Sequence, residues 1–141
     1  MGERSREGHE LAQELSESGV LPYASLIYGP MGESPAVRFL TPYSATTVSE
    51  YLRDEKERNV LFFIDNIFRF AQAGSELSLL MGNVPSESGY QPTLTSEIAS
   101  IHERLVPKDG KYITTIEAVY LPEDDLFDPA AQEVLGYLDS S

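Results

Sequence analysis

The sequence lacks cysteine altogether. Disulfides and thiolate metal sites are therefore excluded, and the absence is compatible with any reducing compartment. Long hydrophobic runs are missing too, since no apolar stretch approaches the roughly 20 residues that a membrane-spanning helix needs. The first residues, Met-Gly-Glu-Arg-Ser, contain no apolar signal-peptide core. We therefore expect no membrane insertion and no secretion signal in this sequence.

Positive charge is scarce. Lys and Arg total 10 against 23 Asp and Glu, which gives a formal net charge of −13. Such a field repels the phosphates of nucleic acids and anionic lipid surfaces, so we expect no nucleic-acid partner. A bound nucleotide remains compatible with this charge, because Mg²⁺ and a few local cationic or amide groups dominate at short distances.

The remaining composition is that of a globular protein. Hydrophobic residues make up 41% and charged residues 23% of the 141 residues, unlike the composition of disordered chains. This length is typical of one domain, so we expect residues 1–141 to form a single unit.

Hydrophobic spacing predicts alternating helices and strands. The helices are expected at residues 5–18, 46–56, 66–82 and 93–105, with a short last helix starting at Asp128 and Pro129. The strands are expected at residues 25–28, 60–64 and 112–121, separated by loops that include residues 30–44 and 83–92. The uninterrupted apolar run at 60–64 is typical of a central strand covered on both faces. The order favours an open, largely parallel α/β sheet that binds its ligand beyond the carboxyl ends of the strands.

The strongest local signal is the run Leu61-Phe-Phe-Ile-Asp65-Asn66. A hydrophobic strand that delivers a carboxylate at its tip is the Walker-B arrangement, in which Asp65 holds the Mg²⁺ of a nucleotide through water. Alternatively, Asp65 caps the following helix. Arg69 lies one helical turn further on, where it can reach a phosphate or form a plain ion pair with Asp65.

Two more charged segments have a functional and a structural interpretation. Residues 2–8, GERSREG, combine a possible base with guanidinium groups that can bind phosphate, or they form a solvated helix start. For the acidic residues 123–125 and Asp128, a solvated turn that ends in a helix cap is the default interpretation and requires no function. His9 and His102 have no partner at metal-ligand spacing, so both are expected to be exposed.

A phosphate-binding P-loop, G-x-x-x-x-G-K-S/T, is absent from the 141 residues. Gly110-Lys111-Tyr112 does not satisfy the pattern. The backbone amides and the lysine of a P-loop cradle the phosphates, so the sequence contains half of a phosphoryl-transfer site.

Five motifs together resemble the catalytic beta subunit of F-type ATP synthases, in that family's order and over nearly the whole chain. They are GERSREG at 2–8, LFFIDNIFRF at 61–70, AGSE at 73–76, GYQPTL at 89–94 and YLPEDDLFDP at 120–129. The resemblance implies a partial RecA-like core of the P-loop NTPase class. It also implies Mg²⁺ with ATP or ADP as cofactors, and ATP synthesis or hydrolysis coupled to rotary proton or sodium transport.

The resemblance further implies roles for individual residues. Glu3 would orient the attacking water, Arg4 and Arg69 would bind phosphate, Glu7 and Asp65 would hold the Mg²⁺ shell through water, and Tyr120 would line the phosphate end of the site. Asp124, Asp125 and Asp128 would contact the rotating central stalk, as would the loop from Gly82 to Leu94. The partners would be alpha subunits and the gamma stalk, at the cytoplasmic face of a bacterial inner membrane or the equivalent organelle face.

Some features depart from the family. Pro42 lies in a region that is helical in the family, so the helix is expected to start later here. Leu40 stands where the family often has a basic residue, and Phe127 replaces a small polar residue. The N-terminal barrel, the P-loop and the C-terminal helical domain lie outside the sequence, so we expect a domain truncated at both ends. That piece is expected to be inactive alone and to self-associate through an uncovered sheet edge. The alternative is a non-catalytic, degenerate RecA-like module that binds proteins.

Overall fold

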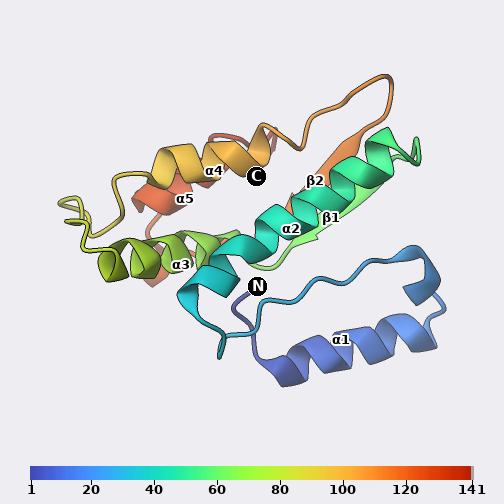
Figure 1. Ribbon diagram of the computed structural model, residues 1–141, viewed down its shortest axis with the longest axis horizontal. Coiled ribbons are helices and arrows are strands. Elements are labelled where there is room, and N and C mark those ends of the chain that lie inside the picture. Colours follow the sequence, from blue (N-terminus) through green and yellow to red (C-terminus); the bar gives the residue numbers. More distant parts are fainter. Residues whose placement is uncertain (141) are drawn as a thin grey trace.

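The computed structural model describes residues 1–140, apart from the side chain of Glu123, and shows two parallel strands accompanied by five α-helices (Figure 1). The helices are α1 (Ser5–Glu17), α2 (Pro35–Asp54), α3 (Ile67–Leu80), α4 (Leu94–His102) and α5 (Pro129–Leu135). The strands are β1 (Val60–Ile64) and β2 (Ile113–Glu117), and short 3₁₀ helices span Leu21–Tyr23 and Pro122–Asp124. The predicted α/β class with a parallel sheet is confirmed.

The two strands end together. Their register runs from Val60 opposite Ile113 to Ile64 opposite Glu117. Pairing continues beyond the strands, because the amide of Ala118 donates to the Ile64 carbonyl at 2.9 Å. The residues after β1 and those after β2 therefore lie at the same edge of the sheet, which is the edge where parallel sheets bind ligands.

Strand β1 is covered on one face in the described part of the chain, so the prediction of burial on both faces was wrong. Phe62 and Ile64 point into the core, whereas Leu61 and Phe63 are exposed. Ile116, which pairs with Phe63, is also exposed. An apolar residue at every position cannot reveal how many faces are covered, because side chains of a strand alternate whatever lies opposite them.

Helix α2 begins far earlier than expected, and the loop predicted at residues 30–44 was wrong. Ser34 is the N-cap, accepting a hydrogen bond from the amide of Val37, and Pro35 occupies the first turn, where a proline is tolerated. Pro42 lies buried inside the helix. The hydroxyl of Thr46 donates to the Pro42 carbonyl at 2.8 Å, which satisfies a buried polar group.

Aromatic packing between α2 and α3 explains why the helix continues through Pro42. Phe70 of α3 is fully buried, stacks on Phe39 of α2 at a centroid distance of 4.9 Å, and meets Tyr43 edge-on at 5.7 Å. Burial of this aromatic cluster outweighs the helix-breaking tendency of a proline, since tertiary packing supplies most helical stability in proteins.

The strand predicted at residues 25–28 is absent; this segment is extended and returns alongside α1. The Tyr28 hydroxyl donates to the Gly8 carbonyl at 2.9 Å. Further along, the amide of Met31 donates to the Glu3 carbonyl at 3.0 Å. In Figure 1, α1 and the returning segment form an arm beside the rest of the chain. Short apolar runs predict strands poorly because a strand also needs a partner.

None of the helices in residues 1–140 combines the length and the apolar character required to cross a bilayer.

Phe70→Ala should lower the free energy of unfolding by about 3–5 kcal/mol, because it removes a fully buried ring from the core. Phe63→Ala is the matched control: the ring is 64% exposed, so its loss should cost less than about 1 kcal/mol. Urea unfolding followed by circular dichroism measures both. Similar losses in the two variants would contradict the assignment of the core.

The exposed apolar residues of the sheet, together with the unpaired edge of β1 in this two-stranded sheet, should make the chain self-associate. Light scattering at about 0.15 M salt, where the net charge is largely screened, should give a mass above that of a monomer. The double variant Leu61→Thr/Phe63→Thr should shift the mass toward the monomer. A monomeric parent chain at high concentration would refute the expectation.

Candidate functional site

Asp65 follows β1 directly and is exposed at the strand tip. The N-cap of α3 is Asn66, whose Oδ1 accepts from the amide of Arg69 at 3.3 Å, so the alternative in which Asp65 caps this helix was wrong. The Asp65–Asn66 peptide bond is cis. Within residues 1–140, no side chain forms a hydrogen bond or ion pair with the Asp65 carboxylate. This carboxylate is therefore available to a ligand.

The charged groups of Glu3 and Arg69 lie near Asp65, together with the amino group of Met1. This amino group donates to the Asp65 carbonyl oxygen. Burial lowers the pKa of this amino group, while the nearby carboxylates of Asp65 and Glu3 raise it and the guanidinium of Arg69 lowers it. The hydrogen bond from Met1 to the Asp65 carbonyl brings residues 1–3, which include Glu3, to the carboxyl end of the sheet.

A glycine allows the first residues of the chain to approach the Arg69 side chain closely. Gly2 has φ +65°, and a Cβ atom at this position would lie 3.1 Å from Cβ and 3.2 Å from Cγ of Arg69. The backbone at Gly2 therefore presses directly on the Arg69 stem. The guanidinium donates to Gln72 Oε1 at 3.3 Å, and no ion pair with Asp65 is found among the described residues. The alternative of a plain Asp65–Arg69 ion pair is thus not seen.

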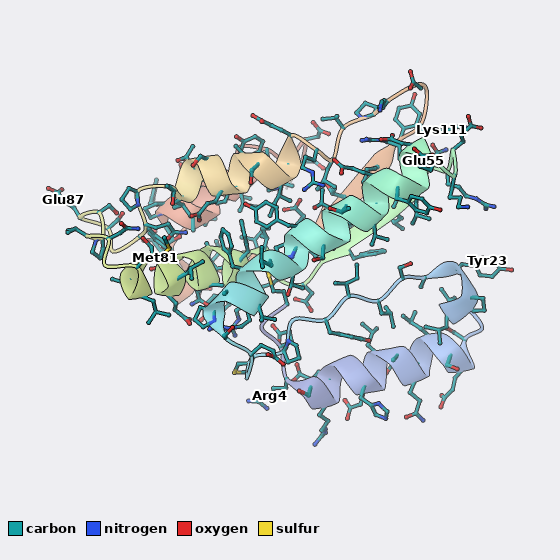
Figure 2. All side chains as sticks on the ribbon, viewed as in Figure 1. Arg4, Tyr23, Glu55, Met81, Glu87 and Lys111 are labelled. Carbon is teal, nitrogen blue, oxygen red and sulfur yellow. The ribbon has the colours of Figure 1, made fainter. Side chains whose placement is uncertain are left out.

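Arg4 and Glu7 lie at the start of α1. Arg4 immediately precedes α1, and Figure 2 shows its side chain directed away from the strands. Glu7 is exposed in the first turn of α1. In the part of the chain that the structure describes, no hydrogen bond or ion pair joins either residue to Asp65.

Tyr120 is placed at the Asp65 edge of the sheet by the parallel pairing of the strands. Its ring is exposed and leans on Phe68 of α3, with centroids 5.7 Å apart. An aromatic face is thus available beside the strand tip.

In the acidic turn, two of the three predicted stalk residues have structural partners. Asp128 Oδ1 caps α5 by accepting from the amide of Ala130 at 2.9 Å, and its Oδ2 accepts from the Tyr90 hydroxyl at 2.7 Å. Asp125 accepts from the amide of Phe127 at 2.8 Å. The helix-cap interpretation of Asp128 is confirmed.

The turn also presents a ring to solvent. Phe127 is 85% exposed, and Asp124 has φ +56°. Because Tyr90 belongs to the loop after α3, its bond to Asp128 joins this loop to the acidic turn. Burial, followed by the hydrogen bond to Asp128, raises the pKa of Tyr90.

Sequence reasoning placed His102 wrongly. His9 is exposed as expected, but the side chain of His102 is 6% exposed and contacts Glu117 of β2. The sequence gives no signal for this pair, because its members lie 15 positions apart on different elements.

Arg53 is a second buried residue that the sequence did not reveal. It lies in α2, where it donates to Asp54 at 2.6 and 3.0 Å and to the carbonyls of Arg104 and Val106 at 3.2 and 2.8 Å. The hydrogen bond from Arg53 lowers the pKa of Asp54 to about 2. This guanidinium therefore ties α2 to the segment that follows α4.

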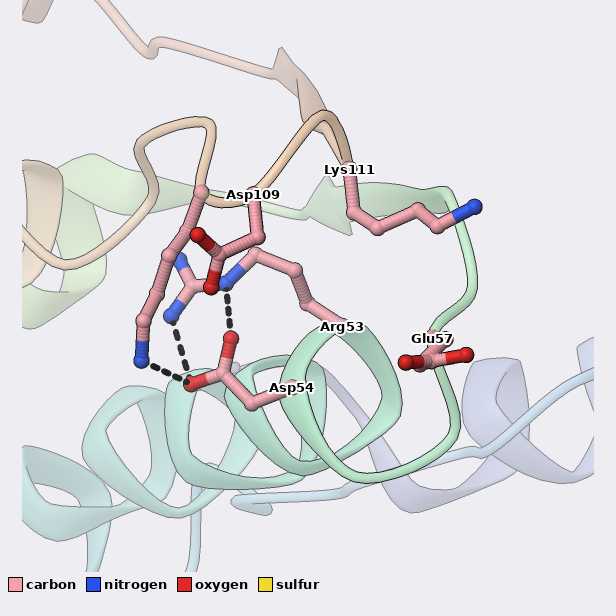
Figure 3. Close-up of a pocket in the computed structure, with 6 residues that line it drawn as sticks. Arg53, Asp54, Glu57, Asp109 and Lys111 are labelled. Atoms are coloured by element: carbon pink, nitrogen blue, oxygen red, sulfur yellow. Dashed lines mark hydrogen bonds and ion pairs between the residues drawn. The ribbon is translucent and has the colours of Figure 1, made fainter.

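Next to Arg53 lies a cavity of about 70 Å³, shown in Figure 3. It is lined by Arg53, Asp54, Glu57, Lys108, Asp109 and Lys111. The volume equals that of about two waters, and the cavity adjoins the amino ends of the strands, opposite Asp65. It is too small and wrongly placed to be the predicted nucleotide site.

Comparison with known proteins assigns the chain to a family. The model of the ATP synthase alpha/beta family, nucleotide-binding domain, matches residues 1–141. The chain belongs to this family. The match confirms the resemblance that the motifs indicated, because it extends over the entire sequence.

Relatives narrow the likeness to beta subunits. ATP synthase subunit beta 1 of Paraburkholderia xenovorans (strain LB400) is 53% identical over 140 residues, which are 99% of this chain and 28% of the relative. ATP synthase subunit beta of Coprothermobacter proteolyticus is 53% identical over 141 residues, which are 100% of this chain and 31% of the relative. The chain thus spans less than a third of the length of either relative.

A solved structure supports the fold. The ATP synthase subunit NeqB from Nanoarcheaum equitans superposes with a TM-score of 0.87 at 28% identity, over 95% of this chain and 34% of that one. The two-stranded parallel sheet with its helices is therefore consistent with part of a RecA-like core.

Tyr90→Phe should lower the free energy of unfolding by about 1 kcal/mol at neutral pH, because it removes a partly buried hydrogen bond to Asp128. The raised pKa of Tyr90 means that its contribution is complete below pH about 10 and is lost as the pH rises further. Tyr23→Phe is the matched control, since Tyr23 is 91% exposed. Urea unfolding at pH 7 and pH 10.5 measures the free energy of unfolding of both variants and the parent chain. A loss for Tyr90→Phe that equals the loss for Tyr23→Phe at pH 7, or that is the same at the two pH values, would contradict this prediction.

Proposed function

We propose that this chain supplies the Mg²⁺ and water-activating side of the nucleotide site in the beta subunit of a rotary ATP synthase. The observation that carries the proposal is the unpaired Asp65 carboxylate at the tip of β1, with the charges of Glu3 and Arg69 beside it. Asp65 would hold Mg²⁺ through water, Glu3 would orient the attacking water, and Arg69 would stabilise the charge that develops on the phosphate.

Three more residues complete the proposed chemistry. Tyr120 lines the phosphate end from the segment after β2, Arg4 binds the terminal phosphate, and Glu7 adds a second carboxylate to the Mg²⁺ shell. Among the described residues, neither Arg4 nor Glu7 forms a hydrogen bond or ion pair with Asp65, so these two roles are supported by the family motif at residues 2–8.

The proposed partners are alpha subunits and the central stalk, in an enzyme that couples ATP turnover to transport of protons or sodium ions. Asp124 and Asp125, with the Gly82–Leu94 loop, form the stalk-facing surface in this proposal, and Asp128 holds the turn and the loop together through Tyr90. The assembly would be peripheral, at the cytoplasmic face of a bacterial inner membrane or the equivalent face of an organelle.

The 141 residues include no P-loop, so the proposal requires phosphate-binding groups from other polypeptide. Accordingly, we expect the 141-residue chain alone neither to bind Mg-ATP tightly nor to hydrolyse it. The second candidate is a RecA-like module that binds proteins without catalysis. The exposed apolar face of the sheet favours it, because such a face suits a protein partner.

A chimera separates the two candidates. Residues 1–141 replace the matching segment of the Coprothermobacter proteolyticus relative, which provides the remainder of its own chain. The purified chimera should hydrolyse Mg-ATP when assembled with that organism's alpha and gamma subunits. Glu3→Gln should lower kcat by about 100-fold or more, because it removes the group that activates water. Asp65→Asn should raise the Mg²⁺ concentration needed for half-maximal activity, because it removes a carboxylate from the Mg²⁺ shell.

Glu14→Gln is the matched control, since Glu14 is exposed on the same arm and should leave kcat unchanged. An assembled but inactive chimera would support the protein-binding module. Full activity of the Glu3→Gln chimera would overturn the role proposed for Glu3.

A further inference from the structure

The imidazole of His102 lies between two hydrogen-bond acceptors. Its Nδ1 is 2.8 Å from the carbonyl oxygen of Ile98, one helical turn earlier in α4. Its Nε2 is 3.0 and 3.1 Å from the two carboxylate oxygens of Glu117. A neutral imidazole carries one N–H and can satisfy one acceptor, whereas the protonated ring donates from both nitrogens. The geometry therefore selects the charged form of His102.

Glu117 depends on this proton. Its side chain is fully buried, and within residues 1–140 His102 is the one cationic group that it contacts. Its Oε1 has no well-directed hydrogen bond in the described part of the chain. A buried carboxylate without a charged partner is costly, so loss of the proton from His102 would leave Glu117 with an uncompensated charge.

Three separate parts of the chain meet at this pair. His102 ends α4, Glu117 ends β2, and the ring of Tyr137, after α5, stacks on His102 with centroids 4.9 Å apart and planes 16° apart. Among the described residues, Glu117 and the Tyr137 phenol are the titratable groups that face the imidazole from these elements. Glu117 also lies opposite Ile64, which precedes Asp65.

We propose that His102 and Glu117 form a proton-binding site that joins α4 to the tip of β2, and that release of the proton loosens this junction. The proposal goes beyond nucleotide chemistry and does not depend on it. Its ligand is a single proton, and its effect is on the contact between α4, the sheet and the segment after α5.

The direction of the pH dependence follows from the surroundings. Burial lowers the pKa of His102, but the hydrogen bonds to Glu117 and to the Ile98 carbonyl outweigh burial and raise the pKa above its ordinary value. A histidine in the unfolded chain has a pKa of about 6.5. The stabilisation is therefore complete below pH about 6.5 and is lost as the pH rises through the higher pKa of the folded state.

Titration of the two histidine rings by NMR, from pH 5 to pH 9, tests the site directly. The His102 signals should titrate with a midpoint above about 6.5, and Glu117→Gln should lower this midpoint by about one pH unit or more. His9→Gln assigns the signals, because His9 is the other histidine and lies exposed on α1. A His102 midpoint at or below the ordinary value, or one unaffected by Glu117→Gln, would overturn the proposal.

Urea unfolding across the same pH range tests the consequence. The urea midpoint should fall between pH 6.5 and pH 9, and the His9→Gln control should show the same fall. The double variant His102→Gln/Glu117→Gln keeps a neutral hydrogen-bonding pair at the junction and should remove most of the fall, even if either single variant fails to fold. An undiminished fall in the double variant would show that other groups cause it, and would refute the proposal.

Discussion

The parallel pairing of β1 with β2 is the constraint on which the rest of the structure depends. It continues past the strands through the hydrogen bond from the Ala118 amide to the Ile64 carbonyl. Because both strands end in register, residues about fifty positions apart are brought to one edge of the sheet. Asp65 and Tyr120 owe their proximity to this pairing. Helices α2 and α3 support it from one face, through the stacking of Phe39 on Phe70.

The edge carries two carboxylates in opposite environments. Asp65, just beyond β1, is exposed and has no side-chain partner in residues 1–140, whereas Glu117, at the end of β2, is fully buried against His102. Glu117 lies on the core side of the pleat, opposite Ile64. Alternation of side chains along paired strands is sufficient to produce this division. One carboxylate is thus available to a cation from solution, and the other is compensated by a protonated side chain.

What could be predicted from the sequence was local. The strand at 60–64, the capping of the last helix by Asp128 and the helix after Asn66 follow from short patterns of apolar and capping residues. The start of α2 did not, because its continuation through Pro42 depends on Phe70, 28 positions away. The face left uncovered by the described helices could not be inferred from an unbroken apolar strand.

The candidate site follows the same division. Asp65, Glu3 and Arg69 were predicted from motifs, and the structure brings Met1 against the Asp65 carbonyl and Gly2 against the Arg69 stem. Motifs could not give the orientation of Arg4, because it depends on the path of the chain into α1. The contact between His102 and Glu117 was not predicted, because it depends on the burial of both side chains and on a shared proton. The spacing of the residues in the sequence shows neither the burial nor the proton.

The distribution of basic side chains determines how much positive charge this chain provides at the candidate site. With 23 acidic and 10 basic side chains, positive charge is limited, and much of it serves the fold. Arg38 pairs with Glu76, Arg53 with Asp54 and Arg104 with Glu50. At the strand tip, the carboxylates of Asp65 and Glu3 are matched by two positive groups, the guanidinium of Arg69 and the amino group of Met1. In the proposed function, Mg²⁺ and phosphate-binding groups from other polypeptide supply the further positive charge that a triphosphate at this point requires. The proposed ligand is therefore a metal-bound nucleotide, because its Mg²⁺ brings positive charge to the Asp65 carboxylate.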